Sequence, residues 1–311
     1  MPSPSEHIKQ AVKAQALRLG FDACGLAAAA PVAREAREHY RRWLAGERNG
    51  CMDWARGHQE LRDNPAALLP GARTVIVVAL NYYPPQLLPP DALQVAYYAY
   101  GRDYHEVLRE KLTVLADFIA RTTGAAVRCC VDSAPVRERY WAQQAGVGFI
   151  GRNNCLIIPG RGSFFFLGEI ITTLALPPDT PCLRQCDGCM ACVRACPTGA
   201  LGSDASAADC RRCLSCLTIE LRGELPDWVP HVLGRRLVGC DTCQLCCPHN
   251  AHALPAAEPD FALTETVRRL TPEGIRKMTG GDFRRAFAHS AVGRVRLKGL
   301  LRNLAAIEKG R

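Results

Sequence analysis

The stretch that decides the fold is residues 186–197, CDGCMACVRACP, which places Cys186, Cys189, Cys192 and Cys196 directly before Pro197. Thiolates with the C-x2-C-x2-C-x3-C-P spacing bind [4Fe-4S] clusters: the first three bind one cluster and the fourth binds a second. Structural zinc sites use paired C-x2-C knuckles instead of this triple run. The spacing therefore predicts a centre with two iron–sulfur clusters.

A second cysteine motif lies at residues 239–250, GCDTCQLCCPHN, and offers Cys240, Cys243 and then Cys246 or Cys247. The gap before proline favours Cys247, by analogy with Cys196, and leaves Cys246 as a buried thiol. Two clusters need eight thiolates, so one more ligand is required. Spacing alone does not choose among the three remaining candidates, which are Cys210, Cys213 and Cys216.

Composition limits the class of protein. The chain has 311 residues, of which 48% are hydrophobic and 22% charged, so it can bury a core and is not a disordered polymer. The sequence contains no run of about 18 apolar residues, which a membrane span would need, and the N-terminus lacks the pattern of a secretory signal. We therefore expect a cytoplasmic protein, in which 17 cysteines hold metal more readily than disulfides.

Positive charge is concentrated at the C-terminal end. Residues 262–311 carry twelve Lys and Arg residues and four acidic residues. This segment therefore contributes a net charge of +8 to the formal net charge of +9 of the whole chain. Such a basic segment favours a polyanion such as nucleic acid, through release of counterions from the phosphates. The alternative is a solvated helical face that binds nothing.

Local patterns predict an α+β fold. Ser3, Pro4 and Glu6 form a capping box that begins a helix, and a second helix is expected over about residues 104–121. The pattern predicts two buried strands, at residues 74–80 (TVIVVAL) and 125–131, and Asp132 directly follows the second. Residues 154–158 and 163–176 are predicted to form a hairpin around a Pro-Gly turn. Neither GVGFIG nor GRGSFFFLG has the strand-then-helix setting of a dinucleotide site.

Several further segments, in order along nearly the whole chain, resemble the epoxyqueuosine reductase family, whose members use cobalamin and iron–sulfur clusters to complete queuosine at the wobble base of tRNA. The matching stretches are MDWARGHQELRDNPAALLPGARTVIVVALNYYP, YAYGRDYH, VDSAPVRERYWAQQAGVGFIGRNN, GSFFFLGEIITTL, CDGCMACVRACPTGAL, RRCLSCLTIELRG, GCDTCQLCCPHN and HSAVGRVRLKGLLRNLAAI. Such ordered coverage is more specific than the cysteine motifs alone.

The resemblance implies the following architecture and partners. A cobalamin-binding catalytic domain of α/β-sandwich type is expected at residues 1–177, an inserted ferredoxin-like domain with two [4Fe-4S] clusters at 178–256, and a basic helical segment at 257–311. The substrate is expected to be the anticodon loop of a tRNA, and an unidentified donor supplies the electrons. A monomer without membrane association is expected. The helical-repeat extension of many relatives is missing, so the basic segment must supply most tRNA contacts.

The resemblance also assigns roles to residues. It implies Cys186, Cys189, Cys192 and Cys247 as ligands of one cluster, and Cys196, Cys213, Cys240 and Cys243 as ligands of the other. Asp132 matches the proton donor of the family. Leu156, Leu167, Ser215 and Asp241 fall in stretches that border the corrin, and Leu221 and Arg222 in one that borders corrin or tRNA. Arg294, Arg296 and Lys298 of the basic segment are expected to contact tRNA.

The implied chemistry places demands on Asp132. Opening an epoxide and losing its oxygen as water takes two electrons and protons, so an acid must protonate the departing oxygen. Asp132 suits this task if burial beside an apolar macrocycle raises its pKa above the usual value of about 3.9. The other interpretation is a carboxylate that accepts hydrogen bonds at a strand end. Tyr104 and His105 are also possible acid–base groups, but they more often begin a helix and pack.

Two positions depart from the family pattern and two other functions remain open. His249 stands where a tryptophan is common, and Cys216 where a tyrosine is common, although neither change removes a predicted ligand. The alternative enzyme is a cobalamin-dependent reductive dehalogenase-like oxidoreductase, which usually carries an export signal. The alternative outside this class is a ferredoxin-type electron-transfer protein, which would leave the upstream residues unexplained.

Overall fold

The structure is a computed structural model that describes residues 3–202 and 208–310, and it divides into two compact units. The first, here the sheet unit, comprises Met1–Arg42, Gly57–Asn81 and His105–Gly188. The second, here the cysteine unit, comprises Trp43–Arg56, Tyr82–Tyr104 and Cys189–Arg311. Each unit is therefore assembled from separated stretches of chain. The domain boundaries expected after residues 177 and 256 stay predictions.

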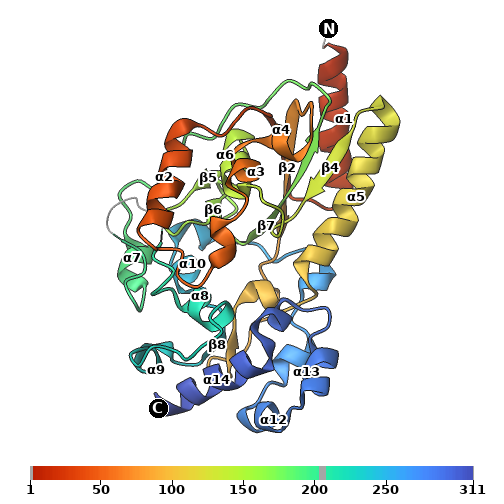
Figure 1. The fold of residues 1–311 in the computed structure, drawn as a ribbon. Helices are drawn as coiled ribbons and strands as arrows, with labels where there is room; N and C mark the ends of the chain where they lie inside the picture. Colours follow the sequence, from red (N-terminus) through yellow and green to blue (C-terminus); the bar gives the residue numbers. More distant parts are fainter. Residues whose placement is uncertain (1–2, 203–207, 311) are drawn as a thin grey trace. The chain divides into compact units, whose positions relative to one another are not determined.

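An antiparallel four-stranded sheet organises the sheet unit, with the strand order β1-β2-β7-β4 (Figure 1). Its strands are β1 (Ala23–Ala28), β2 (Thr74–Asn81), β7 (Phe165–Thr172) and β4 (Val127–Cys130). Every residue of β2 is buried, as expected for the β-branched run at 74–80. β7 lies between β2 and β4, so the last strand in sequence is central in the sheet.

Two strand predictions were wrong in detail. β4 is an edge strand rather than a buried one: only Cys130 is fully buried, and Arg128 is exposed. The hairpin expected around residues 159–162 is reduced to one isolated bridge between Ile158 and Gly162. β6 (Leu156–Ile157) pairs instead with β5 (Phe149–Ile150), because the apolar residues of β7 are buried in the main sheet.

Helices cover both faces of this sheet (Figure 1). α5 (Tyr104–Thr123) packs its buried leucines on one face, where Leu112 approaches Gly168. α6 (Glu138–Gln144) packs Trp141 on the opposite face. α1 (Pro4–Arg18) begins as predicted, since Ser3 Oγ accepts the Glu6 N–H, but the Glu6 carboxylate is bonded by Gln10 rather than completing the capping box. The remaining helices here are α2 (Arg34–Ala45), which continues into the cysteine unit, α3 (Gln59–Asp63) and α4 (Pro65–Leu68).

The cysteine unit is built from short elements around its own apolar core. Its strands β3 (Gln94–Val95) and β8 (Arg236–Val238) pair in parallel. Its first helices are α7 (Ala191–Ala195), α8 (Leu214–Ile219), α9 (Val229–Leu233) and α10 (Thr242–Leu245). Single 3-10 turns are found at Asp53–Arg56, Tyr97–Ala99, Pro248–Asn250, Pro259–Phe261 and Ala291–Val295.

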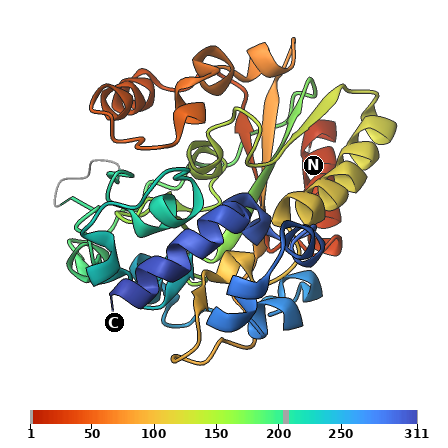
Figure 2. The ribbon, with the colours of Figure 1, turned by 60° about the horizontal axis from the view of Figure 1, so that its bottom comes forward.

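The C-terminal segment is helical, as expected. It contains α11 (Glu265–Arg268), α12 (Pro272–Lys277), α13 (Gly280–Ala286) and α14 (Arg296–Lys309). α14 packs against α8, α9 and β8, and it is the long dark blue helix in Figure 2. Leu300, Leu304 and Ile307 on its inner face join the core of the cysteine unit. Strands with packed helices confirm the α+β class, and none of the helices in the described ranges is long and apolar enough to span a membrane.

Candidate active site and cysteine centre

Asp132 lies in a loop that leaves the edge of the main sheet. β4 ends at Cys130, and Asp132 follows two residues later with φ of +31°. A positive φ is strained for a residue with a Cβ, so surrounding contacts must hold this conformation. Its side chain is 51% exposed. The protein by itself therefore does not bury the carboxyl group as the sequence-based hypothesis required.

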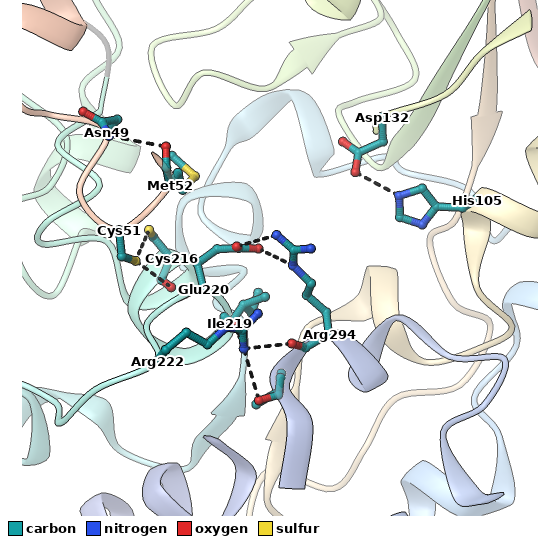
Figure 3. A network of polar contacts seen from close by, with 11 residues as sticks. Asn49, Cys51, Met52, His105, Asp132, Cys216, Ile219, Glu220, Arg222 and Arg294 are labelled. Atoms are coloured by element: carbon teal, nitrogen blue, oxygen red, sulfur yellow. Dashed lines mark hydrogen bonds and ion pairs between the residues drawn. The ribbon is translucent and has the colours of Figure 1, made fainter. Parts of the chain in front are cut away.

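His105 contacts the carboxyl group of Asp132. It lies in the first turn of α5, and its Nε2 is 3.0 Å from Asp132 Oδ2 (Figure 3). Either the imidazole N–H or a protonated carboxyl donates this hydrogen bond. The sequence analysis named His105 as a possible acid–base group but favoured a role in beginning a helix, because the sequence cannot show that the first turn of α5 lies beside the end of β4.

Glu138 contacts the backbone of the same loop and was missed by sequence reasoning. It is the first residue of α6, and its Oε1 accepts the Asp132 N–H at 2.7 Å. Burial, followed by the negative charge of Asp132, raises the pKa of Glu138 to about 7, although the Asp132 N–H, Arg139 and His105 oppose the shift. Glu138 is therefore a carboxyl group that titrates near neutral pH.

Glu169 is a second acid that sequence reasoning missed. It lies on β7, opposite Val77 of β2 and Cys130 of β4, and is fully buried. Within the described ranges neither carboxyl oxygen has a hydrogen-bond partner. Burial, then the charges of Glu138 and Asp132, raises the pKa of Glu169 well above the usual value, which favours its neutral form. A glutamate inside the apolar run FFFLGEII was the available signal.

The first cysteine motif continues into the cysteine unit through Cys189, Cys192 and Cys196. Cys192 is buried in α7, and Cys196 follows the end of that helix. Burial raises the pKa of Cys196, but hydrogen bonds from Thr198 and from the backbone N–H groups that follow outweigh it, so the net pKa is lowered. A sulfur that receives several N–H bonds is suited to bind iron as a thiolate.

The second motif lies beside the first. α10, which carries Cys243, packs against α7, and the sulfur of Cys246 lies in the electrostatic field of Cys243, Cys189 and Cys196. Cys246 itself donates to the backbone oxygen of Cys243 at 3.7 Å. Cys213 caps α8 close to Cys240, and burial raises its pKa to about 12.

The sulfur chemistry fits iron–sulfur clusters. None of the 17 cysteines forms a disulfide bond. No three His, Cys, Asp or Glu side chains within residues 3–202 and 208–310 are arranged around a single metal ion. A [4Fe-4S] cube binds each thiolate through a different iron, so its ligands need not converge on one point. The thiols therefore fit clusters better than a mononuclear site.

Cys51 and Cys216 form a thiol pair that the sequence analysis did not predict. Their sulfurs lie 3.5 Å apart, and Figure 3 shows them beside Glu220. The hydrogen bond from Cys216 lowers the pKa of Cys51 to about 7, whereas hydrogen bonds to Cys210 and Cys51 raise that of Cys216. Cys51 is therefore the more reactive thiol of the pair.

The residues expected near the corrin fall into two groups. Leu156 and Leu167 are buried in the core of the sheet unit. In the cysteine unit, Asp241 Oδ2 accepts the Tyr97 N–H at 2.8 Å, and burial raises its pKa to about 6. Ser215 in α8 and Leu221 just after it are partly buried.

A cavity of about 310 Å³ borders Asp241. Its lining combines apolar side chains such as Val95 and Leu245 with backbone and polar groups such as Thr242. This mixture fits part of a corrin, because the ring is apolar and its edge carries amides.

The expected tRNA-binding residues cluster in the cysteine unit. Arg294, Arg296, Lys298 and Arg222 are exposed, and Arg222 Nη1 donates to the backbone oxygen of Arg294 at 3.0 Å (Figure 3). Desolvation, then the charges of Arg296 and Arg294, lowers the pKa of Arg222, so these three arginines lie close together. With Lys298, two residues after Arg296 in α14, they are called the basic cluster. Arg294 also pairs with Glu220 at 2.7 Å, which neutralises part of its charge.

Comparison with known proteins identifies the family of the chain. Residues 62–133 match the model described as epoxyqueuosine reductase QueG, DUF1730, and residues 185–250 match a 4Fe-4S double cluster binding domain. The chain is 38% identical to the epoxyqueuosine reductase of Leadbetterella byssophila over 299 residues, which is 96% of this chain and 97% of the relative. This chain belongs to the epoxyqueuosine reductase family.

Other members of the family agree. The epoxyqueuosine reductase of Escherichia coli is 37% identical over 98% of this chain and 81% of its own length. A crystal structure of epoxyqueuosine reductase with an epoxyqueuosine-modified tRNA-Tyr stem loop aligns with a TM-score of 0.89 and 28% identity, covering 98% of this chain and 82% of that one. The Bacillus subtilis enzyme, solved with its catalytic aspartate loop swung out of the active site, aligns with a TM-score of 0.86 and 29% identity over the same shares.

Membership of the epoxyqueuosine reductase family decides between the functions that the sequence left open. The chain is an oxidoreductase of this family, which uses cobalamin and two [4Fe-4S] clusters. The dehalogenase-like and ferredoxin-type alternatives are less well supported, because the relatives that match over nearly the full length are epoxyqueuosine reductases.

Proposed function

We propose that this chain reduces epoxyqueuosine to queuosine at the wobble position of tRNA, with Asp132 as the proton donor. The observation that carries the proposal is the placement of Asp132: its carboxyl contacts His105, and its backbone is held by Glu138. A half-exposed carboxyl group can reach a substrate, and a protonated one can give its proton to the oxygen that leaves the epoxide.

The proposed cluster ligands follow the family pattern. Cys186, Cys189, Cys192 and Cys247 would hold one cluster, and Cys196, Cys213, Cys240 and Cys243 the other. The hydrogen bonds to Cys196 support its role as a ligand. In the sheet unit, Cys186 Sγ already accepts the Arg152 N–H at 3.4 Å, as a thiolate ligand does.

Cobalamin, when bound, supplies a low-valent cobalt that transfers electrons. Leu156, Leu167, Ser215, Leu221 and Asp241 are the residues proposed to border it. The chain's own part is to present an apolar surface, to keep water away from the reacting atoms and to hold the proton of Asp132 until the epoxide opens.

The basic cluster is the proposed tRNA contact. Arg222, Arg294, Arg296 and Lys298 present positive charge without base-specific geometry, which suits phosphate recognition. The solved relative with a tRNA stem loop supports tRNA as the substrate. We also expect a cytoplasmic monomer that receives electrons from a separate donor.

The loop that carries Asp132 is proposed to move. It leaves an edge strand, and the Bacillus subtilis relative has been solved with its catalytic aspartate loop swung out. In this chain the loop conformation described above would be the one that presents Asp132 for catalysis.

A direct experiment tests the reaction. Purified protein with both clusters and cobalamin loaded is incubated anaerobically with a chemical reductant and tRNA from a strain that lacks the enzyme. The tRNA is then digested and its nucleosides are weighed. Loss of one oxygen from epoxyqueuosine supports the proposal, and an unchanged mass with all cofactors loaded contradicts it.

A further inference from the structure

The side chains of His105 and Glu138 contact different atoms of Asp132. His105 contacts the carboxyl group, whereas the carboxyl group of Glu138 accepts the backbone N–H. The backbone bond matters because β4 ends at Cys130, so the N–H of Asp132 takes no part in the sheet ladder. A bond to the N–H fixes where the loop lies, whatever the state of the Asp132 side chain.

Other bonds within the loop are local. Ala134 donates its N–H to Val131 at 3.0 Å, and Val136 donates to Ala134 at 2.8 Å. Such turns shape the loop but move with it if it swings. Glu138 is different because it belongs to α6, which packs on the sheet.

The start of α6 is firmly anchored. Both Nε and Nη2 of Arg137 donate to Asp63 Oδ1, at 3.0 and 2.5 Å, and both side chains are nearly buried. The Arg137 guanidinium also lies over the ring of Tyr40, 4.4 Å from its centre. Glu138 therefore reaches the loop from a fixed platform, which is what precise positioning requires.

The strain at Asp132 indicates that this hold is needed. A φ of +31° is unfavourable for aspartate, so an unsupported loop relaxes to other conformations. A hydrogen bond to a carboxyl group offsets strain of this kind, and does so more strongly when the acceptor is charged. Removing the acceptor is thus sufficient to release the loop.

We propose that Glu138 is a positioning residue, which holds the Asp132 loop in its catalytic conformation through the Asp132 N–H. This inference rests on the proposed role of Asp132 and adds a residue that acts through it. Glu138 itself need not touch substrate or transfer a proton.

The test compares three variants in the fully loaded enzyme. Glu138→Gln keeps an oxygen acceptor, Glu138→Leu removes it at similar volume, and Glu35→Leu changes an exposed glutamate on α2 as a control. The readouts are kcat and KM for epoxyqueuosine-containing tRNA, and hydrogen exchange of the peptide that spans residues 131–137. Iron content and thermal midpoint establish that each variant is folded.

The expected result is a split between the two Glu138 variants. Glu138→Leu lowers kcat by about 10- to 100-fold with little change in KM, and speeds exchange in the loop, because a displaced acid loses alignment. Glu138→Gln stays within about threefold of the wild type, since its amide oxygen can still accept the N–H. The control matches the wild type in every readout.

Two outcomes overturn the inference. One is a Glu138→Leu enzyme with normal kcat or with unchanged loop exchange. The other is equal loss of activity in Glu138→Gln and Glu138→Leu, which would show that the ionisable proton matters rather than the acceptor. The proposed function itself is contradicted if the wild type does not reduce epoxyqueuosine or if Asp132→Asn keeps its activity. In either case the hydrogen-exchange data still decide whether Glu138 holds the loop.

Discussion

The acid site of the sheet unit and the cysteine centre are held in place by different means. Asp132 contacts side chains from two helices: His105 from α5 and Glu138 from α6. The cysteines lie instead on turns and on helices of four to six residues, such as α7, α8 and α10. Protein contacts alone arrange the acid site, whereas the cysteine centre depends on a bound cluster to tie its short elements together. Substitutions in the two regions should therefore have different consequences.

The largest effect is expected from losing a cluster ligand. Cys213→Ala should reduce iron and sulfide by about half and abolish reduction of epoxyqueuosine, because one of two clusters is lost. Cys216→Ala, three residues along in α8, is the matched control and should retain full iron. Iron and sulfide assays with an anaerobic absorption spectrum check this. Full iron in Cys213→Ala would show that the eighth ligand lies elsewhere.

Losing the acid should be severe but should leave the cofactors in place. Asp132→Asn keeps the size of the side chain and removes the proton, so kcat should fall by about 10²- to 10⁴-fold. Iron content and cobalamin retention should equal those of the wild type. Single-turnover nucleoside analysis measures the loss, and a kcat within a few-fold of wild type would exclude Asp132 as the donor.

Charge reversal in the basic cluster should weaken binding rather than chemistry. The triple variant Arg294→Glu, Arg296→Glu, Lys298→Glu should raise the Kd for tRNA and lower the slope of log Kd against log salt by about one per lost phosphate contact. Arg294 should contribute least, because Glu220 already neutralises it. Arg121→Glu, at the exposed end of α5, is the control. Unchanged binding would identify the basic segment as a solvated face.

A smaller effect concerns stability and pH. Because the pKa of Glu138 is raised to about 7 in the folded protein, it binds its proton more tightly there than in the unfolded chain, where the pKa is near 4.5. This group therefore stabilises the fold at acidic pH, and that contribution is lost as pH rises to about 7. Glu138→Gln cannot ionise and should not lose this stability. Between pH 5 and 8 its free energy of unfolding should therefore rise relative to that of the wild type by on the order of 1–3 kcal/mol.

Anaerobic thermal unfolding at the two pH values provides the measurement. Parallel pH dependence in wild type and variant would show that Glu138 ionises normally.

The smallest effect is a local one in reactivity. Cys51, with a pKa of about 7, should be alkylated at neutral pH far faster than Cys24, whose pKa burial raises to about 12. Replacing Cys216 by alanine removes the hydrogen bond and should slow modification of Cys51 by about tenfold or more. Peptide mass spectrometry after brief alkylation measures both rates, and equal rates would contradict the thiol pair.

Sequence reasoning succeeded where chemistry is encoded in local spacing. The cysteine motif, the fully buried β2 and the helix from Tyr104 are all patterns within one segment. The family was likewise identified from ordered segments, because each segment could be matched separately.

The missed features depend on contacts between distant segments. β4 was expected to be buried, but the strand order places it at an edge, and its burial pattern follows from that order. His105 meets Asp132, 27 positions away, only because α5 begins beside the end of β4. Cys51 meets Cys216 across 165 positions of sequence. Spacing within one chain carries no signal for such meetings.

The central position of β7 has a consequence for synthesis of the chain. β2 is complete at Asn81, yet its partner β7 is not finished until Thr172. A nascent polypeptide shorter than this exposes a strand that is apolar from Val75 to Leu80 and has an unpaired edge, and such edges invite aggregation. Ribosome-bound intermediates up to that length should therefore need a chaperone, and C-terminal truncations before Thr172 should be insoluble.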